Sequence, residues 1–166
     1  MRRENDYYPT PHSIIRALFK NYTPPTRLVW EPCAGDGRLA TALFNFGLEV
    51  ITSDISSGDD FFLYDKAPQT KTIITNPPFS RIRDFIDHAF KIGIESMALV
   101  CPERLWACKK GLEQFKRHRP SRFANLTWRE DYLGKGGAPD RALAVSVWDS
   151  PCAKSCQFEV WDKPNG

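Results

Sequence analysis

A buried strand that stops at two prolines is the feature that most limits how this chain can fold. Ile73 and Ile74 are apolar and β-branched, which favours a buried strand. Pro77 and Pro78 cannot extend that strand because proline has no backbone N–H to donate to a neighbouring strand. The chain must therefore leave the sheet at Asn76 in a stiff turn. In α/β proteins, turns at strand ends hold the functional side chains.

Short apolar segments alternate with segments of helical periodicity along most of the chain. Strands are expected at residues 28–30, 49–54, 71–75 and 97–101, and helices at residues 10–20, 38–47, 80–93 and 103–118. Thr10 and Ser80 are expected to cap the first and third helices. Two strands at 123–128 and 142–148, joined by residues 129–141, complete the pattern. It predicts an α/β fold with a mostly parallel sheet, helices on both faces and a C-terminal antiparallel strand pair.

Composition narrows the class of protein. With 166 residues and no internal repeat or linker, one domain spanning 1–166 is expected. A membrane span is excluded because no run of about 18 apolar residues occurs. The first residues lack the apolar stretch of a signal peptide, so a cytoplasmic protein is expected. The five cysteines include no CxxC pair and are expected to be reduced thiols; a zinc site that uses Cys152 and Cys156 is the other interpretation.

Positive charge is concentrated near the C-terminus. Residues 104–141 hold 10 basic and 4 acidic side chains, with aromatic residues between them. Such a segment fits a polyanionic partner, but a solvated basic face over core aromatics would show the same composition.

Polar motifs follow the first two strands. In EPCAGDG, residues 31–37, two glycines allow close approach of a ligand to the backbone at a helix start, although a purely structural turn has the same pattern. Glu31 would repel a phosphate and suits an amino-bearing ligand. Asp54, at the tip of the second strand, can accept hydrogen bonds from both hydroxyls of a ribose. Asp60 can accept from an exocyclic amino group, and Phe61 can lie against a base.

Together, YYPTP at residues 7–11, EPCAGDG, Asp54, Asp60-Phe61 and NPPF resemble a class I S-adenosylmethionine-dependent methyltransferase. Within that class the order of motifs is similar to that of amino-group (N6-adenine) methyltransferases, especially small phage and prophage DNA adenine methylases. The resemblance covers residues 7–102. It implies a Rossmann-like fold, S-adenosylmethionine as cofactor, S-adenosylhomocysteine as product, no metal, and methylation of adenine N6 in DNA in the cytoplasm of a bacterial or phage-infected cell.

The resemblance also implies roles for individual residues. Glu31 would meet the methionine end of the cofactor, and Asp54 the ribose. Asp60 would meet the adenine amino group, with the adenine near Phe61. The predicted cofactor-binding set is completed by Tyr8, Thr10, Pro11, Pro32, Ala34, Gly35, Gly37, Ile55 and Asn76, of which Thr10 and Pro11 would close over the methionine carboxylate.

The NPPF turn would supply the catalytic residues. The side-chain oxygen of Asn76 and the carbonyl of Pro77 would accept hydrogen bonds from the target amino group. Pro78 would hold that carbonyl in place, and Phe79 would stack on the base after it leaves the helix.

The sequence departs from the usual pattern in two places. Only six residues separate Asp54 from Asp60, so the edge of the sheet on that side should be trimmed. Residues 1–166 are expected to hold no separate target-recognition domain, which leaves the basic segment 103–148 to contact nucleic acid. The predicted contacts are Lys109, Lys110, Arg129, Lys135 and Arg141. Low sequence specificity is expected, or a short site read by a homodimer or with a partner protein.

Three other functions share parts of this pattern. An RNA adenine-N6 methyltransferase has the same catalytic motif. A protein-glutamine methyltransferase has an Asn-Pro-Pro-aromatic motif, but usually with tyrosine where this chain has Phe79. A non-catalytic nucleic-acid-binding protein with this fold need not retain Glu31, Asp54 and Asn76, all of which are present.

Overall fold

The computed structural model describes residues 9–130 and 142–165. In chain order the helices and strands are α1 (His12–Asn21), β1 (Leu28–Glu31), α2 (Arg38–Asn45), β2 (Glu49–Thr52), β3 (Thr72–Thr75), α3 (Ile82–Lys91), β4 (Ser96–Pro102), α4 (Lys109–Arg117), β5 (Arg122–Arg129), β6 (Ala142–Trp148) and β7 (Gln157–Trp161). Three short 3-10 turns interrupt the connections: η2 (Ile55–Ser57), η3 (Phe61–Leu63) and η4 (Phe79–Arg81).

The strands form one seven-stranded sheet in the order β2-β1-β3-β4-β6-β5-β7. The first four strands are parallel, β6 runs antiparallel to β4 and β5, and β7 runs parallel to β5. The predicted mostly parallel sheet with an antiparallel strand pair is confirmed. The trimmed edge is confirmed as well, because β2 is the outer strand and only η2 and η3 lie between it and β3.

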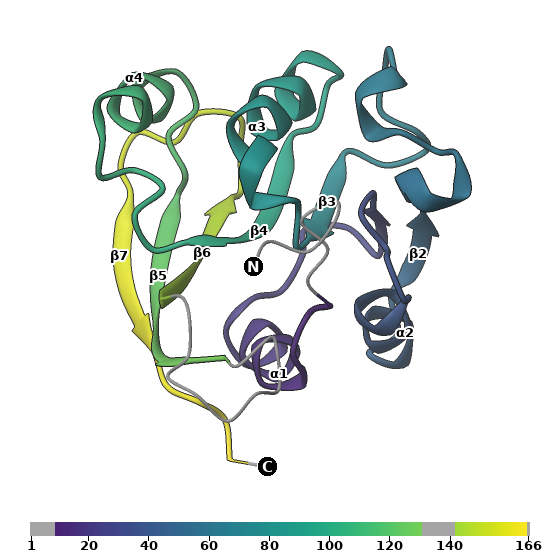
Figure 1. Ribbon diagram of the computed structural model, residues 1–166, viewed down its shortest axis with the longest axis horizontal. Coiled ribbons are helices and arrows are strands. Elements are labelled where there is room, and N and C mark those ends of the chain that lie inside the picture. The colour runs from purple at the N-terminus through teal and green to yellow at the C-terminus, as the bar shows by residue number, and fades with distance from the viewer. Residues whose placement is uncertain (1–8, 131–141, 166) are drawn as a thin grey trace.

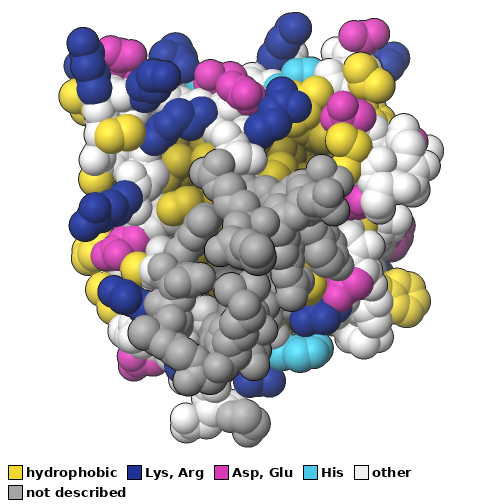
Figure 2. Space-filling model, in the orientation of Figure 1, with side chains coloured by type: hydrophobic (Ala, Val, Ile, Leu, Met, Phe, Trp, Pro, Cys, Tyr) yellow, Lys and Arg dark blue, Asp and Glu magenta, His cyan; other side chains and the backbone are white. Residues whose placement is uncertain are grey.

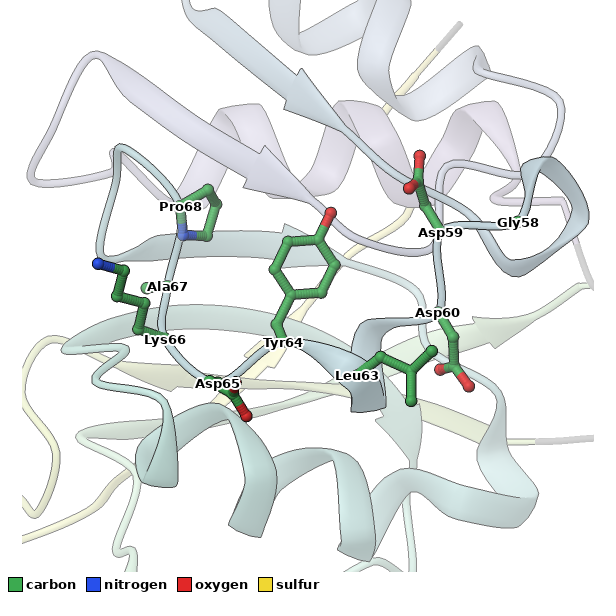
Figure 3. Close-up of a pocket in the computed structure, with 9 residues that line it drawn as sticks. All are labelled: Gly58, Asp59, Asp60, Leu63, Tyr64, Asp65, Lys66, Ala67 and Pro68. Atoms are coloured by element: carbon green, nitrogen blue, oxygen red, sulfur yellow. The ribbon is translucent and has the colours of Figure 1, made fainter.

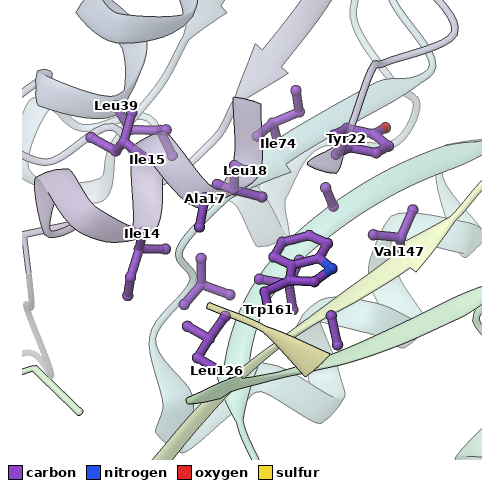
Figure 4. Packing of buried hydrophobic residues seen from close by; sticks show 14 of the residues in the cluster. Ile14, Ile15, Ala17, Leu18, Tyr22, Leu39, Ile74, Leu126, Val147 and Trp161 are labelled. Atoms are coloured by element: carbon purple, nitrogen blue, oxygen red, sulfur yellow. The ribbon is translucent and has the colours of Figure 1, made fainter. Parts of the chain in front are cut away.

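Apolar side chains fill both faces of the sheet. On one face, α1 and α2 pack through residues such as Ile14, Leu18 and Leu39 against the strands (Figure 4). On the other face, Phe85 and Ile86 of α3 pack against Trp30 and strand residues. Figure 1 shows α3 and α4 together at the top of the view, with α1 and α2 below. Helices therefore cover both faces, as the alternating pattern predicts.

The starts of α1 and α3 differ from prediction. The N-cap of α1 is Pro11 rather than Thr10, and the carbonyl of Pro11 accepts from the N–H groups of Ile14 and Ile15. The N-cap of α3 is Arg81 because Ser80 lies inside η4.

The basic helix begins at Lys109, not near residue 103, because Leu105 is buried and the chain turns to place it in the core. The Sγ of Cys108 then caps α4 by accepting from the Gly111 N–H at 3.3 Å. A Cβ on Gly111 would lie 2.5 Å from the carbonyl oxygen of Leu105, so this close approach requires glycine.

The last strand, β7, was not predicted. Its neighbour β5 holds it partly through Arg122, whose Nε and Nη2 donate to the two carboxylate oxygens of Glu159 at 2.7 and 2.8 Å. The indole N–H of Trp161 also donates to Glu159, at 2.7 Å, and the Trp161 ring is buried. Phe158 and Val160, on the opposite face of β7, are exposed. The apolar residues of β7 therefore do not coincide with its buried positions.

Candidate active site

The carboxyl ends of three adjacent parallel strands bring the predicted residues to one edge of the sheet. Glu31 ends β1, and its partner in the register is Thr52, the last residue of β2. Asp54 follows β2 by two residues, and Asn76 follows β3 directly. In open parallel sheets this edge is where ligands bind.

Glu31 is a buried carboxyl group with one hydrogen-bonded oxygen. Its Oε1 accepts from the Cys33 N–H at 3.1 Å and from the hydroxyl of Thr75. Its Oε2 is buried and has no hydrogen-bond partner among the described residues. Burial raises the pKa of Glu31 to about 8, although the hydrogen bonds from Thr75 and Cys33 oppose the shift. The site therefore has an unsatisfied acidic group that a buried ammonium donor would satisfy.

Asp54 joins the turn after β1 to the turn after β2. Its Oδ2 accepts from the Gly35 N–H at 2.8 Å, and its Oδ1 accepts from the N–H and hydroxyl of Ser56 at 2.8 and 2.5 Å. Partial burial raises the pKa of Asp54, but the hydrogen bonds from Ser56 and Gly35 outweigh burial and lower it. Asp54 thus stays ionised at neutral pH and can accept further hydrogen bonds.

The turn between β1 and α2 leaves backbone open to a ligand. Gly37 is the N-cap of α2 and has φ +78°, a conformation that favours glycine. A Cβ on Gly37 would meet no atom within 4 Å, so the space beside it is open. Pro32 is buried and Ala34 half-buried in the same turn.

The NPPF turn is anchored to the core. Asn76 and Pro78 are half-buried, and Pro77 is buried. The carbonyl of Pro78 accepts from the Arg81 N–H at 3.1 Å, which closes η4. Phe79, predicted to stack on the target base, is half-buried and contacts the apolar cores on both faces of the sheet. Only part of its ring is therefore free to meet a base.

Phe61, near which the cofactor's adenine is predicted to rest, is a core residue. Phe61 is 4% exposed and stacks on Phe85 with ring centroids 4.0 Å apart, so its ring belongs to the core. Asp60 is half-buried, and its Oδ1 accepts from the Phe62 N–H at 2.9 Å. An open depression of about 520 Å³ lies beside this turn, lined by residues of the single segment 58–68, with Asp60 and Tyr64 among them (Figure 3).

The remaining predicted cofactor contacts lie around this edge. Thr10 is buried and Pro11 is half-buried at the start of α1, and Ile55 is exposed in η2. Tyr8 lies outside the described residues.

The predicted nucleic-acid contacts lie at the same edge where the structure describes them. Lys109 and Lys110 are exposed in the first turn of α4. Arg129 is exposed at the end of β5, which runs parallel to β4, so it too lies at the carboxyl edge. Lys135 and Arg141 lie outside the described residues. Figure 2 shows lysine and arginine side chains gathered at the top of the view, over α3 and α4.

Two contacts at the site escaped the sequence analysis. Thr75 connects the catalytic turn to Glu31, and its only sequence signal is a hydroxyl at the end of an otherwise apolar strand. Glu130, which follows β5, accepts from the Ser13 hydroxyl and, at 2.6 Å, from the indole N–H of Trp128. This pair of hydrogen bonds joins the first turn of α1 to the end of β5.

No protein-family profile matches the chain, and no curated protein matches it. Solved structures do match. A candidate class I S-adenosylmethionine-dependent methyltransferase from Listeria monocytogenes has a TM-score of 0.62 at 12% identity, covering 95% of this chain and 67% of that one. A candidate RNA methyltransferase from Pyrococcus horikoshii has a TM-score of 0.68 at 18% identity, with coverage of 90% and 88%. This is the class I methyltransferase fold.

The methyltransferase fold also occurs in a larger neighbour. The methyltransferase subunit of a type I restriction-modification system from Streptococcus thermophilus has a TM-score of 0.62 at 10% identity. The match covers 92% of this chain but 47% of the subunit, so this chain spans about half of that protein's length.

Within the part of the chain that the structure describes, no helix is long and apolar enough to cross a membrane, and no cluster of three or more metal-ligating side chains occurs.

Proposed function

We propose that the protein transfers a methyl group from S-adenosylmethionine to the N6 amino group of adenine in DNA. The observation that carries this proposal is the hydrogen bond from the Thr75 hydroxyl to Glu31. It joins the acidic group expected to hold a cofactor directly to the last residue of β3, which Asn76-Pro77-Pro78-Phe79 follows. The class I methyltransferase fold supports the proposal.

The residues present fit the cofactor. The unsatisfied Oε2 of Glu31 would accept from the amino group of the methionine moiety. Asp54 would hold the ribose hydroxyls, and Asp60, at the wall of the depression, the adenine amino group. When bound, S-adenosylmethionine supplies an activated methyl group on a sulfonium. The protein's own contribution is binding, orientation and electrostatics.

The NPPF turn addresses the weak nucleophilicity of the target. An aromatic amino group is a poor nucleophile because its lone pair is delocalised into the ring. The Asn76 side-chain oxygen and the Pro77 carbonyl would accept from its two hydrogens and favour the tetrahedral nitrogen that forms as methyl transfer proceeds. Phe79 would stack on the flipped base with the part of its ring that the core leaves free.

The nucleic acid would approach along the carboxyl edge of the sheet, where Lys109, Lys110 and Arg129 lie. Within residues 1–166 the basic segment 103–148 is the part that would contact nucleic acid, so we expect low sequence specificity or a short site read by a dimer. Adenine N6 in RNA is the second candidate substrate. A structural neighbour described as a candidate RNA methyltransferase supports it.

The test is methyl transfer from radiolabelled S-adenosylmethionine to duplex DNA, single-stranded DNA, RNA and a protein mixture, with digestion to nucleosides to identify the product. N6-methyladenosine or its deoxy form is the expected product, and the labelled polymer decides between DNA and RNA.

The variant Asn76→Ala should lower kcat by at least about 100-fold, because it removes one acceptor used in the transition state. Its affinity for S-adenosylhomocysteine by calorimetry should stay within about threefold of wild type, since Glu31, Asp54 and Asp60 would supply most of the cofactor contacts and Asn76 would mainly contact the target amino group. Labelling of protein alone, or of no substrate, would refute the proposal. Loss of cofactor affinity together with activity would show that Asn76 binds the cofactor instead.

A further inference from the structure

Arg81 is a positively charged residue that directly follows the NPPF turn, two positions after Phe79. It is the last residue of η4, and its backbone N–H donates to the Pro78 carbonyl at 3.1 Å. Its guanidinium carbon lies 3.7 Å from the centroid of the Phe62 ring, in the turn that follows Asp60. The side chain therefore bridges the catalytic turn and the turn expected at the adenine end of the cofactor.

The stacked guanidinium has donors to spare. Arginine carries five N–H donors in a planar fork, and stacking over a ring leaves the edge of that plane open. The carboxylate of Asp84 lies 3.6 Å from Nε, and both side chains are more than half exposed. An exposed pair at this distance contributes little and does not occupy the two Nη groups. Phe62 thus fixes the position of the cation without neutralising it.

Arg81 also continues the basic surface of α4. Two residues further on, Arg83 donates from Nη2 to the Leu105 carbonyl at 2.5 Å and lies 3.2 Å from the Sγ of Cys108, the N-cap of α4. Lys109 and Lys110 follow that cap directly. The start of α3 and the start of α4 are therefore neighbours, and Figure 2 shows lysine and arginine side chains gathered over these two helices.

We propose that Arg81 binds a phosphate of the nucleic-acid backbone beside the target base, at the inner end of a basic track that begins at Lys109 and Lys110. This inference rests on the proposed function and adds a residue to it. A guanidinium fork matches the geometry of phosphate oxygens. Because the backbone of Arg81 is hydrogen-bonded to Pro78, a phosphate held there would place its nucleotide next to Pro77 and Phe79.

The test is binding and methylation by Arg81→Gln, Arg81→Lys and a matched control, Arg27→Gln. Arg27 is also an exposed arginine with one exposed carboxylate nearby, Glu49, at 3.8 Å. It precedes β1, at the opposite edge of the sheet from the site. Fluorescence anisotropy measures Kd for a fluorescein-labelled DNA duplex, or its RNA counterpart if wild type methylates RNA, over a series of NaCl concentrations.

For Arg81→Gln we expect Kd and KM to rise about fivefold and the slope of log Kd against log salt to fall by about 0.7–0.9, the loss of one phosphate contact. Arg81→Lys should keep the slope but bind more weakly than wild type, since it retains the charge and loses the fork. Asp84→Asn should bind more tightly. If Arg81 only connected the two turns and contacted no phosphate, Arg81→Gln would leave the slope of log Kd against log salt unchanged.

An unchanged slope and Kd in Arg81→Gln, while wild type binds and methylates, would overturn this inference and leave the proposed function intact. An equal loss in Arg27→Gln would also overturn it, because the effect would then be one of net charge. A wild type that binds neither polymer would overturn both. Affinity for S-adenosylhomocysteine and the thermal melting temperature, measured for each variant, identify any that fail to fold.

Discussion

The buried carboxyl group of Glu31 makes the stability of the protein depend on pH in a way that one substitution removes. Folded Glu31 keeps its proton up to a pKa of about 8, whereas its ordinary value is 4.5. Between pH 4.5 and about pH 8, unfolding therefore releases a proton from Glu31, and the free energy of unfolding falls as pH rises through this range. Glu31→Gln has the same shape and no charge, so it should lose this dependence.

The magnitude follows from the two pKa values. Each unit of difference corresponds to about 1.4 kcal/mol, so ionisation of the unfolded carboxyl group lowers the stability of wild type by about 3 kcal/mol at pH 7 and about 1 kcal/mol at pH 5. Glu31→Gln escapes this loss. An amide placed at the position of Oε2 leaves its own donors unpaired, which reduces the gain by an amount that hardly changes with pH. The quantity to measure is therefore how much the difference in stability between wild type and Glu31→Gln changes from pH 5 to pH 7, which is about 2 kcal/mol.

Urea unfolding followed by circular dichroism at pH 5, 6 and 7 measures the difference between wild type and Glu31→Gln. Glu49→Gln is the control, because Glu49 is exposed at the start of β2 and should show no comparable trend. Calorimetry in two buffers of different ionisation enthalpy adds a second readout. Binding of S-adenosylhomocysteine to wild type at pH 7 should release close to one proton, as Glu31 ionises against the ligand's amino group, and Glu31→Gln should bind at least about tenfold more weakly without proton release.

A difference in stability that stays constant from pH 5 to pH 7 would refute the reasoning. It would mean that Glu31 is ionised in the folded protein and that its charge is balanced there. Tight binding of S-adenosylhomocysteine by Glu31→Gln would instead refute the role of Glu31 as the partner of the amino group, while leaving its burial unchallenged.

Three further changes test other parts of the structure. Asp54→Asn should weaken S-adenosylhomocysteine binding about 10- to 100-fold by calorimetry, since it removes a charged acceptor; unchanged affinity would contradict its role. Pro77→Ala keeps the carbonyl and loses only rigidity, so kcat in the methyl-transfer assay should fall less than in Asn76→Ala; an equal loss would contradict this. Glu159→Gln should lower the free energy of urea unfolding at pH 7 by about 1–3 kcal/mol. Arg122 lowers the pKa of Glu159, so this loss should shrink as pH falls below 4.5; a loss as large at pH 3 as at pH 7 would contradict it.

Patterns of neighbouring residues in the sequence predicted the order and type of most helices and strands up to residue 102. Parallel strands with apolar runs and glycine-ended helices are specified by nearby residues, and β1, α2, β3 and β4 lie within two residues of their predicted bounds. The same patterns placed the start of α4 too early, because burial of Leu105 and the close approach of Gly111 to its carbonyl depend on the rest of the fold. They also missed β7, which depends on Arg122, Glu159 and Trp161 meeting across strands.

The sequence by itself determined which chemical groups reach the carboxyl edge of the sheet. Acidic and proline-containing motifs directly after strands are brought together in any parallel sheet, so the sequence predicts that Glu31, Asp54 and Asn76 lie at one edge. Tertiary structure alone decided the state of those groups. It buried Glu31 against Thr75 and raised its pKa, buried the Phe61 ring in the core, and stacked Arg81 on Phe62. Burial and contacts between distant segments depend on how the whole chain packs, which local residue patterns do not specify.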